Sequence, residues 1–277
     1  MIHLPRLEAR RYLQPLREGG SLPAVVETTD GLYVVKFRGA GQGPLALIAE
    51  VVAGLIAREV GLPVPQLALI EIADGFGAEQ ADPEIRDLLA ASSGTNVGLR
   101  YLDGAFNFDG RAAGDFVSAD LAAEVVWLDA LLTNPDRTAR NPNLMAWDRR
   151  IWLIDHGSAL YAHHAWSRVD VTRTRTPFPL IADHVLLDMA GDVGEVDARL
   201  ADVLTRERLG AVMDALPDAL LMDPLARAGF RSADEARARY VTYLVDRLAP
   251  HRAWVDEIGR AQARRRARPA KRLEIRR

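Results

Sequence analysis

One stretch, residues 134–157, constrains the fold of this 277-residue chain more than any other. An apolar run with helical character, residues 121–132, leads into a polar turn that carries Asp and Asn. Two short apolar runs, residues 143–147 and 151–154, then predict a β-hairpin that ends in Asp-His-Gly. This order predicts two carboxylates and one carboxamide presented from loops beside a helix and a hairpin.

The polar residues of this stretch, Asp136, Asn141 and Asp155, suit phosphoryl transfer. That reaction needs a carboxylate near the attacking hydroxyl group and hard oxygen ligands for magnesium, held in line with the γ-phosphate. Asp136 and Asn141 have the Asp-x-x-x-x-Asn spacing of a kinase catalytic loop, in which Asp meets the acceptor hydroxyl and Asn binds metal. Asp155 suits a second metal ligand.

The spacing alone is a weak signal, because Asp and Asn are common in turns, where they cap local backbone amides. The order of the elements favours the functional interpretation, since helix, Asp, Asn, hairpin and Ile-Asp-x-Gly follow one another in one short segment. An apolar strand that ends in Asp and Gly lets a ligand leave the sheet without competing with strand pairing. We therefore predict a phosphoryl-transfer centre here.

The first hundred residues have the pattern of a small antiparallel sheet, with strands over residues 11–16, 24–27 and 32–37. Lys36 lies in the third of these strands. Alternation permits a lysine exposed to solvent, but the third-strand position also fits the kinase lysine that binds the α- and β-phosphates.

Gly19, Gly20 and Ser21 form the turn between the first two of these strands. Backbone amides of this turn could cover nucleotide phosphates, with Ser21 as a γ-phosphate contact or an autophosphorylation site. An ordinary hairpin turn explains the same residues, because they match Gly-x-Gly-x-x-Gly poorly.

A helix is predicted over residues 44–60, from the proline at its start to a Gly and a Pro beyond its end. Glu50 falls on a row of alanines, where another segment can approach closely, and we expect it to pair with Lys36 as in kinases. The alternative is a solvated glutamate, and Glu59 is a second candidate for a functional role.

The strand that precedes residue 103 would lead to a hinge in a kinase-like order, with backbone groups of Arg100, Tyr101 and Leu102 bound to adenine. A plain strand and turn fits these residues equally well. The remaining elements predicted before residue 103 are two strands and a short helix, over residues 66–72, 96–102 and 83–91.

Three segments follow from these patterns. Residues 1–102 form a sheet with one helix, and residues 103–259 are mostly helical, apart from a Thr- and Arg-rich strand or loop before Pro179. Residues 260–277 hold nine Lys or Arg and one Glu, in a chain of net charge −3. This basic tail can bind nucleic acid or an acidic partner, but no aromatic residue is interleaved, which favours a fraying helix end.

The composition limits the compartment. Absence of cysteine excludes a disulfide framework and a Cys-based zinc site, and it fits a reducing cytoplasm. No apolar run approaches the ~18 residues of a membrane span, and the first residues lack signal-peptide features. We expect a cytoplasmic protein without a membrane partner.

With Lys36, Glu50, Asp136, Asn141 and Asp155 in this order, the chain resembles the HipA-like kinases, and most of all their short, single-module bacterial members. The segments that carry the likeness are Gly-Leu-Tyr-Val-Val-Lys-Phe-Arg-Gly, Asn-Pro-Asp-Arg-Thr-Ala-Arg-Asn-Pro-Asn-Leu and Leu-Ile-Asp-His-Gly.

The resemblance implies an α+β, bilobed protein-kinase-like fold, with a small β-rich N-lobe and a mostly helical C-lobe. It also implies ATP and Mg²⁺ as cofactors, and transfer of the γ-phosphoryl group to a protein Ser or Thr. By this likeness Lys36 would hold the phosphates and Glu50 would orient it. Asp136 would be the catalytic base, and Asn141 with Asp155 would hold magnesium.

Two other functions stay open from the sequence. The irregular glycine turn would suit a pseudokinase or nucleotide-sensing interaction module. A small-molecule phosphotransferase would instead use the helical half as the acceptor pocket for a lipid, sugar or antibiotic. The sequence identifies neither the acceptor protein nor an antitoxin-like partner.

Overall fold

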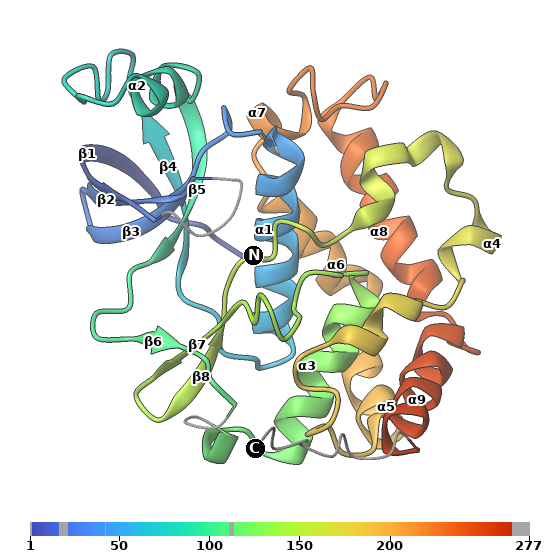
Figure 1. The fold of residues 1–277 in the computed structure, drawn as a ribbon. Helices are drawn as coiled ribbons and strands as arrows, with labels where there is room; N and C mark the ends of the chain where they lie inside the picture. Colours follow the sequence, from blue (N-terminus) through green and yellow to red (C-terminus); the bar gives the residue numbers. More distant parts are fainter. Residues whose placement is uncertain (1, 17–21, 42, 111–113, 268–277) are drawn as a thin grey trace, which may run out of the picture.

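The strands and helices segregate in space, with most strands from the first hundred residues and most helices from the remainder (Figure 1). The computed structural model describes residues 2–16, 22–41, 43–110 and 114–267. The mixed helix and strand content predicted from the sequence is confirmed. No helix in the described part of the chain is long and apolar enough to cross a membrane.

The first sheet is a closed barrel with the strand order β1-β2-β3-β5-β4. Neighbouring strands are antiparallel except β1 and β4, whose parallel pairing closes the barrel, with Arg6 opposite Leu69. This pairing is why the first strand begins at Arg6, earlier than the predicted start at residue 11. The barrel strands are β1 (Arg6–Pro15), β2 (Ala24–Thr28), β3 (Gly31–Lys36), β4 (Leu67–Ile72) and β5 (Gly94–Arg100).

A small apolar core fills the barrel and includes Val26, Tyr33, Val35 and Ile70. Gly98 on β5 makes room for it, because a Cβ at this position would lie 2.9 Å from Ile70 Cγ1 and 3.3 Å from Tyr33 Cβ. Helix α2 (Pro83–Ala90) lies over one end of the barrel and is capped by Asp82, whose carboxylate accepts from the backbone N–H of Glu84.

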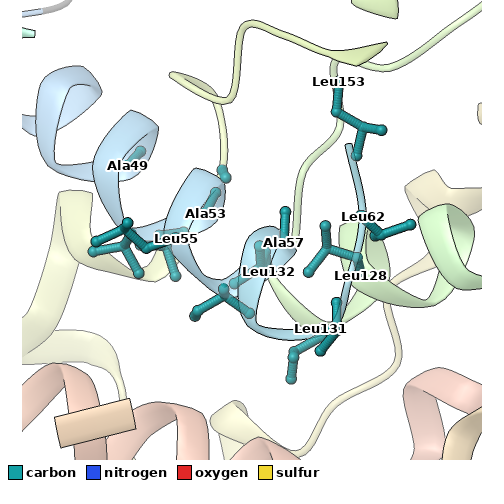
Figure 2. Close-up of a cluster of buried hydrophobic side chains, with 14 of the residues drawn as sticks. Ala49, Ala53, Leu55, Ala57, Leu62, Leu128, Leu131, Leu132 and Leu153 are labelled. Atoms are coloured by element: carbon teal, nitrogen blue, oxygen red, sulfur yellow. The ribbon is translucent and has the colours of Figure 1, made fainter. Parts of the chain in front are cut away.

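Helix α1 (Gly43–Glu59) lies between the barrel and the other helices (Figure 1). It is apolar on nearly all sides, as expected of a helix buried on every face. Its alanines and leucines pack against α3 (Ala119–Leu131) and the end of β8, as Figure 2 shows. The same apolar cluster includes residues of β4 and β5 and continues as far as the last helices, so α1 lies in one core shared by the barrel and the helical part.

The second sheet has the antiparallel order β6-β7-β8 and contains the predicted hairpin. Asp148 and Arg149 both have left-handed φ angles, +49° and +57°, which is the backbone that a tight two-residue hairpin turn requires. The three strands are β6 (Phe106–Asn107), β7 (Leu144–Trp147) and β8 (Arg150–Leu153).

Helical turns replace the strand or loop predicted in the Thr- and Arg-rich segment before Pro179. Asp170 caps one of them, because its carboxylate accepts from the backbone N–H of Arg173. Of the predicted basic tail, residues 260–266 continue the last helix, and residues 268–277 lie outside the described part. The remaining helical segments are η1 (Gly114–Phe116), η2 (Tyr161–Arg168), α4 (Val171–Thr174), η3 (Pro179–Asp183), α5 (Val193–Val203), α6 (Arg206–Asp214), α7 (Asp218–Leu221), α8 (Ala233–Leu248) and α9 (Ala253–Arg266).

Candidate active site

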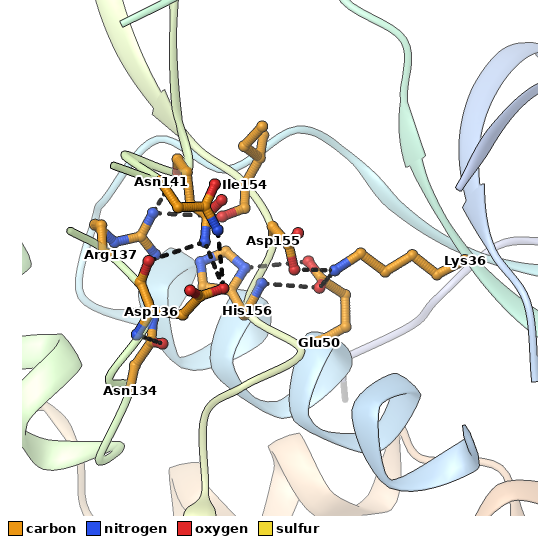
Figure 3. A network of polar contacts seen from close by, with 10 residues as sticks. Lys36, Glu50, Asn134, Asp136, Arg137, Asn141, Ile154, Asp155 and His156 are labelled. Atoms are coloured by element: carbon orange, nitrogen blue, oxygen red, sulfur yellow. Dashed lines mark hydrogen bonds and ion pairs between the residues drawn. The ribbon is translucent and has the colours of Figure 1, made fainter. Parts of the chain in front are cut away.

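Lys36, the last residue of β3, is a buried lysine held between two carboxylates (Figure 3). Its Nζ lies 2.5 Å from Glu50 Oε2 and 2.5 Å from Asp155 Oδ1. Burial alone would lower the pKa of Lys36, but the two negative charges outweigh it and raise the pKa. Lys36 is therefore a fixed ammonium group that joins the barrel, α1 and the segment after β8.

Glu50 on α1 is fully buried and accepts hydrogen bonds from two different parts of the chain. Its Oε2 accepts from Lys36 and, at 2.8 Å, from the backbone N–H of His156, whose Nδ1 lies 3.2 Å from Oε1. Burial would raise the pKa of Glu50, but the charge of Lys36 and the His156 hydrogen bond hold it well below its usual range. Glu59, the other candidate, lies outside this network. Its Oε2 is 3.3 Å from Arg208 Nη1, and its side chain is more exposed to solvent than that of Glu50.

Asp155 follows β8 with a left-handed φ of +52°, a conformation that costs energy for any residue other than glycine. Its side chain is 34% exposed, and its Oδ1 faces Lys36. The strained backbone turns the carboxylate away from the direction of the strand and toward the buried lysine (Figure 3).

Asp136 and Asn141 lie together on the turn after α3 (Figure 3). The Nδ2 of Asn141 donates to Asp136 Oδ2 at 3.0 Å, and the Nδ2 of Asn143 donates to the same oxygen at 3.3 Å. The backbone N–H of Asp136 donates to Asn134 Oδ1 at 3.1 Å. These contacts fix the orientation of a half-exposed carboxylate.

The sequence patterns did not identify Arg137 as a contributor to the site. Its buried guanidinium donates from Nε to Asp129 Oδ2 at 2.6 Å and from Nη1 to the backbone carbonyls of Asn143 and Ile154. Because Ile154 immediately precedes Asp155, Arg137 links the turn that carries Asp136 to the segment that carries Asp155. Its place next to Asp136 was the only available signal, since nothing in the local pattern indicates burial of an arginine.

Asp129 on α3 is the anion that holds Arg137 in place. It also accepts from Asn134 Nδ2 at 2.9 Å and contacts His184 Nε2 at 2.9 Å. Burial would raise the pKa of Asp129, but the charge of Arg137 and the His184 contact outweigh this and keep the pKa well below its usual range. A four-membered polar network therefore lies beneath the catalytic turn.

The oxygen donors of Asn141, Asp155 and Asp136 fit a magnesium ion in chemical type. Asn141 uses its amide nitrogen on Asp136, which leaves its carbonyl oxygen for a ligand. Within the described ranges, no group of three His, Cys, Asp or Glu residues is placed to hold a metal. The protein thus offers only some of the ligands that Mg²⁺ needs. This is usual at sites where phosphate oxygens and water supply the others.

Two of the three backbone N–H groups predicted to contact adenine already donate hydrogen bonds within the protein. The backbone N–H of Arg100 donates to the Gln66 carbonyl at 2.8 Å, and that of Tyr101 donates to the Leu32 carbonyl at 2.9 Å. Only the N–H of Leu102 makes no hydrogen bond to another described residue. The predicted phosphate-covering residues Gly19, Gly20 and Ser21 lie outside the described residues.

A solved structure has a similar fold. The crystal structure of the Helicobacter pylori proinflammatory kinase CtkA superimposes with a TM-score of 0.56 at 12% sequence identity, over 96% of this chain and 100% of that chain. At this identity the likeness shows the fold alone, and the fold is one that a kinase uses.

The particular family follows from the sequence match. Residues 11–220 match the model of the HipA-like kinases, and the chain belongs to that family, which confirms the predicted resemblance. The protein is thus assigned to the kinases, which use ATP. A search of curated protein sequences found no significant match.

Proposed function

We propose that this protein is an ATP- and Mg²⁺-dependent kinase that transfers the γ-phosphoryl group to a Ser or Thr hydroxyl of another protein. One observation carries the proposal: Lys36 Nζ lies within 2.5 Å of both Glu50 and Asp155, residues 14 and 119 positions away in the chain. A buried lysine fixed next to a half-exposed carboxylate is what binding of a metal-associated triphosphate requires.

The chain's own residues have distinct roles in this mechanism. Lys36 binds the phosphates of ATP and is oriented by Glu50. Asp136 accepts the proton of the acceptor hydroxyl while the hydroxyl oxygen bonds to the γ-phosphorus and the bond to the β–γ bridging oxygen breaks. A magnesium ion held by Asn141 and Asp155 would neutralise charge that develops on the phosphates.

The proposal also assigns the large-scale arrangement. The barrel and α1, within residues 1–102, act as the N-lobe of a bilobed kinase, and residues 103–259 act as the C-lobe. The nucleotide then lies between them, with adenine near the backbone of Leu102. The acceptor is a protein, and it approaches from the side of Asp136.

The test is transfer of labelled phosphate from γ-labelled ATP to a protein acceptor, or to the chain itself, with and without Mg²⁺. Asp136→Asn and Asp155→Asn each remove a charge at nearly constant shape and should each lower the transfer rate at least a hundredfold. Asp202→Asn, at an exposed position of α5, is the matched control and should retain the wild-type rate. Equal transfer by all four proteins would contradict the assignment.

A further inference from the structure

A pocket of about 370 Å³ opens next to the candidate catalytic turn. None of the residues given a role in the proposed mechanism lines it. One wall is formed by Thr133 and Pro135, and Pro135 immediately precedes Asp136. Most of the other lining residues come from Tyr161 to Leu180, in the segment that follows Asp155. A ligand bound in this pocket would therefore lie against the catalytic turn.

The floor of the pocket is rigid. Arg247 on α8 is buried and donates to the carbonyls of Leu131, Thr174 and Ala130 at 2.7, 2.8 and 2.7 Å. These bonds join the end of α3, the short helix α4 and α8 in one unit. The part of the pocket formed by Arg247 is thus held by hydrogen bonds between elements of the fold.

The Tyr161–Leu180 side of the pocket is tied to α8 as well. Arg239 donates to the carbonyl of Val169 at 2.5 Å and lies over the ring of Trp166, 4.9 Å from its centroid. The Nδ1 of His163 lies 3.0 Å from the hydroxyl oxygen of Tyr240. The residues that face the pocket are therefore held in a defined position.

The charges that line the pocket are of one sign. Its lining residues include Arg168, Arg173 and Arg247, and no Asp or Glu. Arg168 and Arg173 are exposed, and in the described part of the chain their guanidinium groups make no salt bridge or side-chain hydrogen bond. Two exposed guanidinium groups that lack an anionic partner are suited to bind carboxylates bidentately.

The rim of the pocket is unusually apolar for a protein surface. Tyr161 and Leu180, which line the pocket, are 69% and 55% exposed, and they account for two of the seven large apolar side chains exposed in the described residues. Apolar side chains that gather around an opening indicate a surface for another polypeptide more than a site for a small polar molecule.

We propose that this pocket, lined by Pro135, Tyr161, Arg168, Arg173 and Leu180, binds the acceptor protein through an acidic peptide segment around its Ser or Thr. An apolar side chain of the segment enters the pocket, and flanking Asp or Glu residues pair with Arg168 and Arg173. This inference rests on the proposed kinase function and adds the chemistry of its acceptor.

The experiment uses the full chain and a library of Ser- and Thr-containing peptides with acidic, neutral or basic flanks. Binding is measured with Mg²⁺ and a non-hydrolysable ATP analogue, and transfer is measured separately with ATP. The wild type should bind and phosphorylate peptides with acidic flanks at least tenfold better than those with basic flanks, because charge-assisted hydrogen bonds are lost in the latter.

Charge reversal distinguishes this site from general attraction. Arg168→Glu combined with Arg173→Glu should raise KM for the acidic peptides about tenfold or more and shift the preference toward basic flanks. Arg168→Lys with Arg173→Lys should recover part of the acidic preference. Arg206→Glu, an exposed arginine on α6, should keep the wild-type preference, and thermal melts establish that each variant is folded.

The outcomes separate the two proposals. An acidic preference in binding without any transfer would overturn the kinase proposal, and the pocket would then be a binding site for acidic peptides that are not phosphoryl acceptors. Transfer without a flank preference, or a preference untouched by the double charge reversal, would overturn the acceptor site alone. Equally strong binding of free succinate and acidic peptides would show a small-molecule site and would also overturn it.

Discussion

At the scale of single residues, the most consequential side chain is the buried carboxylate of Glu50. It holds two groups that are far apart in sequence, the ammonium of Lys36 and the backbone N–H of His156. Since His156 directly follows Asp155, one carboxylate positions both Lys36, the proposed phosphate-binding residue, and the candidate metal ligand Asp155. Both groups donate to the same oxygen, Oε2, and a carboxamide oxygen in its place would carry no negative charge to hold the ammonium.

Glu50→Gln should therefore lower kcat/KM for ATP by about a hundredfold, because Lys36 and the segment that carries Asp155 lose the charged carboxylate that anchors both. The matched control is Glu59→Gln on the same helix, whose side chain contacts Arg208 outside the site. Steady-state kinetics of the two variants decides the question. Equal losses in both variants would indicate a general effect on α1 and would contradict the role of Glu50.

A second residue-scale prediction concerns His163, which is buried against Tyr240 and contacts the ring of His164. Burial, together with the neighbouring His164, lowers the pKa of His163 from 6.5 to about 3. In the unfolded chain this imidazole takes up a proton near pH 6.5, whereas in the folded protein it stays neutral. The unfolded state then binds more protons, so stability is retained above pH 6.5 and lost as the pH falls toward 3.

His163→Gln should remove this dependence, which has a slope of about 1.4 kcal/mol per pH unit for one group. Urea unfolding at pH 8, 7, 6 and 5, values chosen to span roughly the histidine range, gives the slope for each protein. His251→Gln, at an exposed position, should keep the wild-type dependence. Parallel curves for the wild type and His163→Gln would refute the assignment.

At the scale of elements, the site depends on how the catalytic turn is attached to its neighbours. Arg137 contacts α3 through Asp129 and the β7 and β8 ends through the carbonyls of Asn143 and Ile154. Arg137→Met should lower the free energy of unfolding by roughly 3–5 kcal/mol, because Asp129 keeps its buried charge and loses its charged partner. It should also lower kcat, since Asp136 and Asp155 are no longer fixed to one another.

Denaturant unfolding and transfer kinetics of Arg137→Met test both effects, with Arg206→Met on the surface of α6 as control. The double variant Arg137→Met with Asp129→Asn is the more informative protein. It should regain part of the stability, because the uncompensated charge is gone, but not the transfer rate. Recovery of both would mean that Arg137 acts only through stability.

Alanine substitution should have opposite effects on stability at two glycines, one in the barrel and one in a helix. Gly98→Ala should destabilise the protein by about 1–3 kcal/mol, because the new Cβ would meet Ile70 and Tyr33 inside the barrel. Gly210 on α6 has no atom within 4 Å of the position of a Cβ, so Gly210→Ala should stabilise by about 1 kcal/mol through helix propensity. Thermal and urea unfolding measure both, and the same sign for both changes would contradict the packing argument.

The elements that the sequence predicts well are those with a strong local signal. Proline and glycine mark both ends of α1, and the short hairpin lies where the two apolar runs predicted it. The turn with Asp136 and Asn141 was predicted from their spacing together with the order of the elements around them. The burial of Arg137 was not predicted. An arginine next to an aspartate in a polar turn is usually exposed to solvent, and only the tertiary contacts show that this one is buried.

The helical turns before Pro179 illustrate the same limit. Thr and Arg side chains there favour no regular element strongly, and the local backbone is decided by α8, which supplies Arg239 and Arg247 from far along the chain. The prediction of a strand or loop was wrong where the structure has α4. Tertiary hydrogen bonds, and not local propensity, set this wall of the pocket.

At the scale of the whole molecule, the closed barrel could not be predicted from local patterns. Alternation identifies strands, but it does not say that β1 pairs in parallel with β4, some sixty residues later in the chain. The row of alanines beside Glu50, by contrast, already indicated that another segment can approach α1 closely. In the structure its other faces are covered by the helices after residue 103, so the proposed lobes share one core.

This shared core predicts that the barrel and the helical part unfold together. The five tryptophans of the chain all follow residue 103, so their fluorescence reports on the helical part, while hydrogen exchange of β3 and β5 amides reports on the barrel. Both should give the same unfolding free energy.

Leu55→Ala on α1 should lower both values by the same amount, about 2–5 kcal/mol, because the cavity lies in the core that joins them. Leu225→Ala, at a side chain that is 77% exposed, should change neither value. Loss of fluorescence while the barrel amides remain protected would instead show that the barrel with α1 is stable without the helical part.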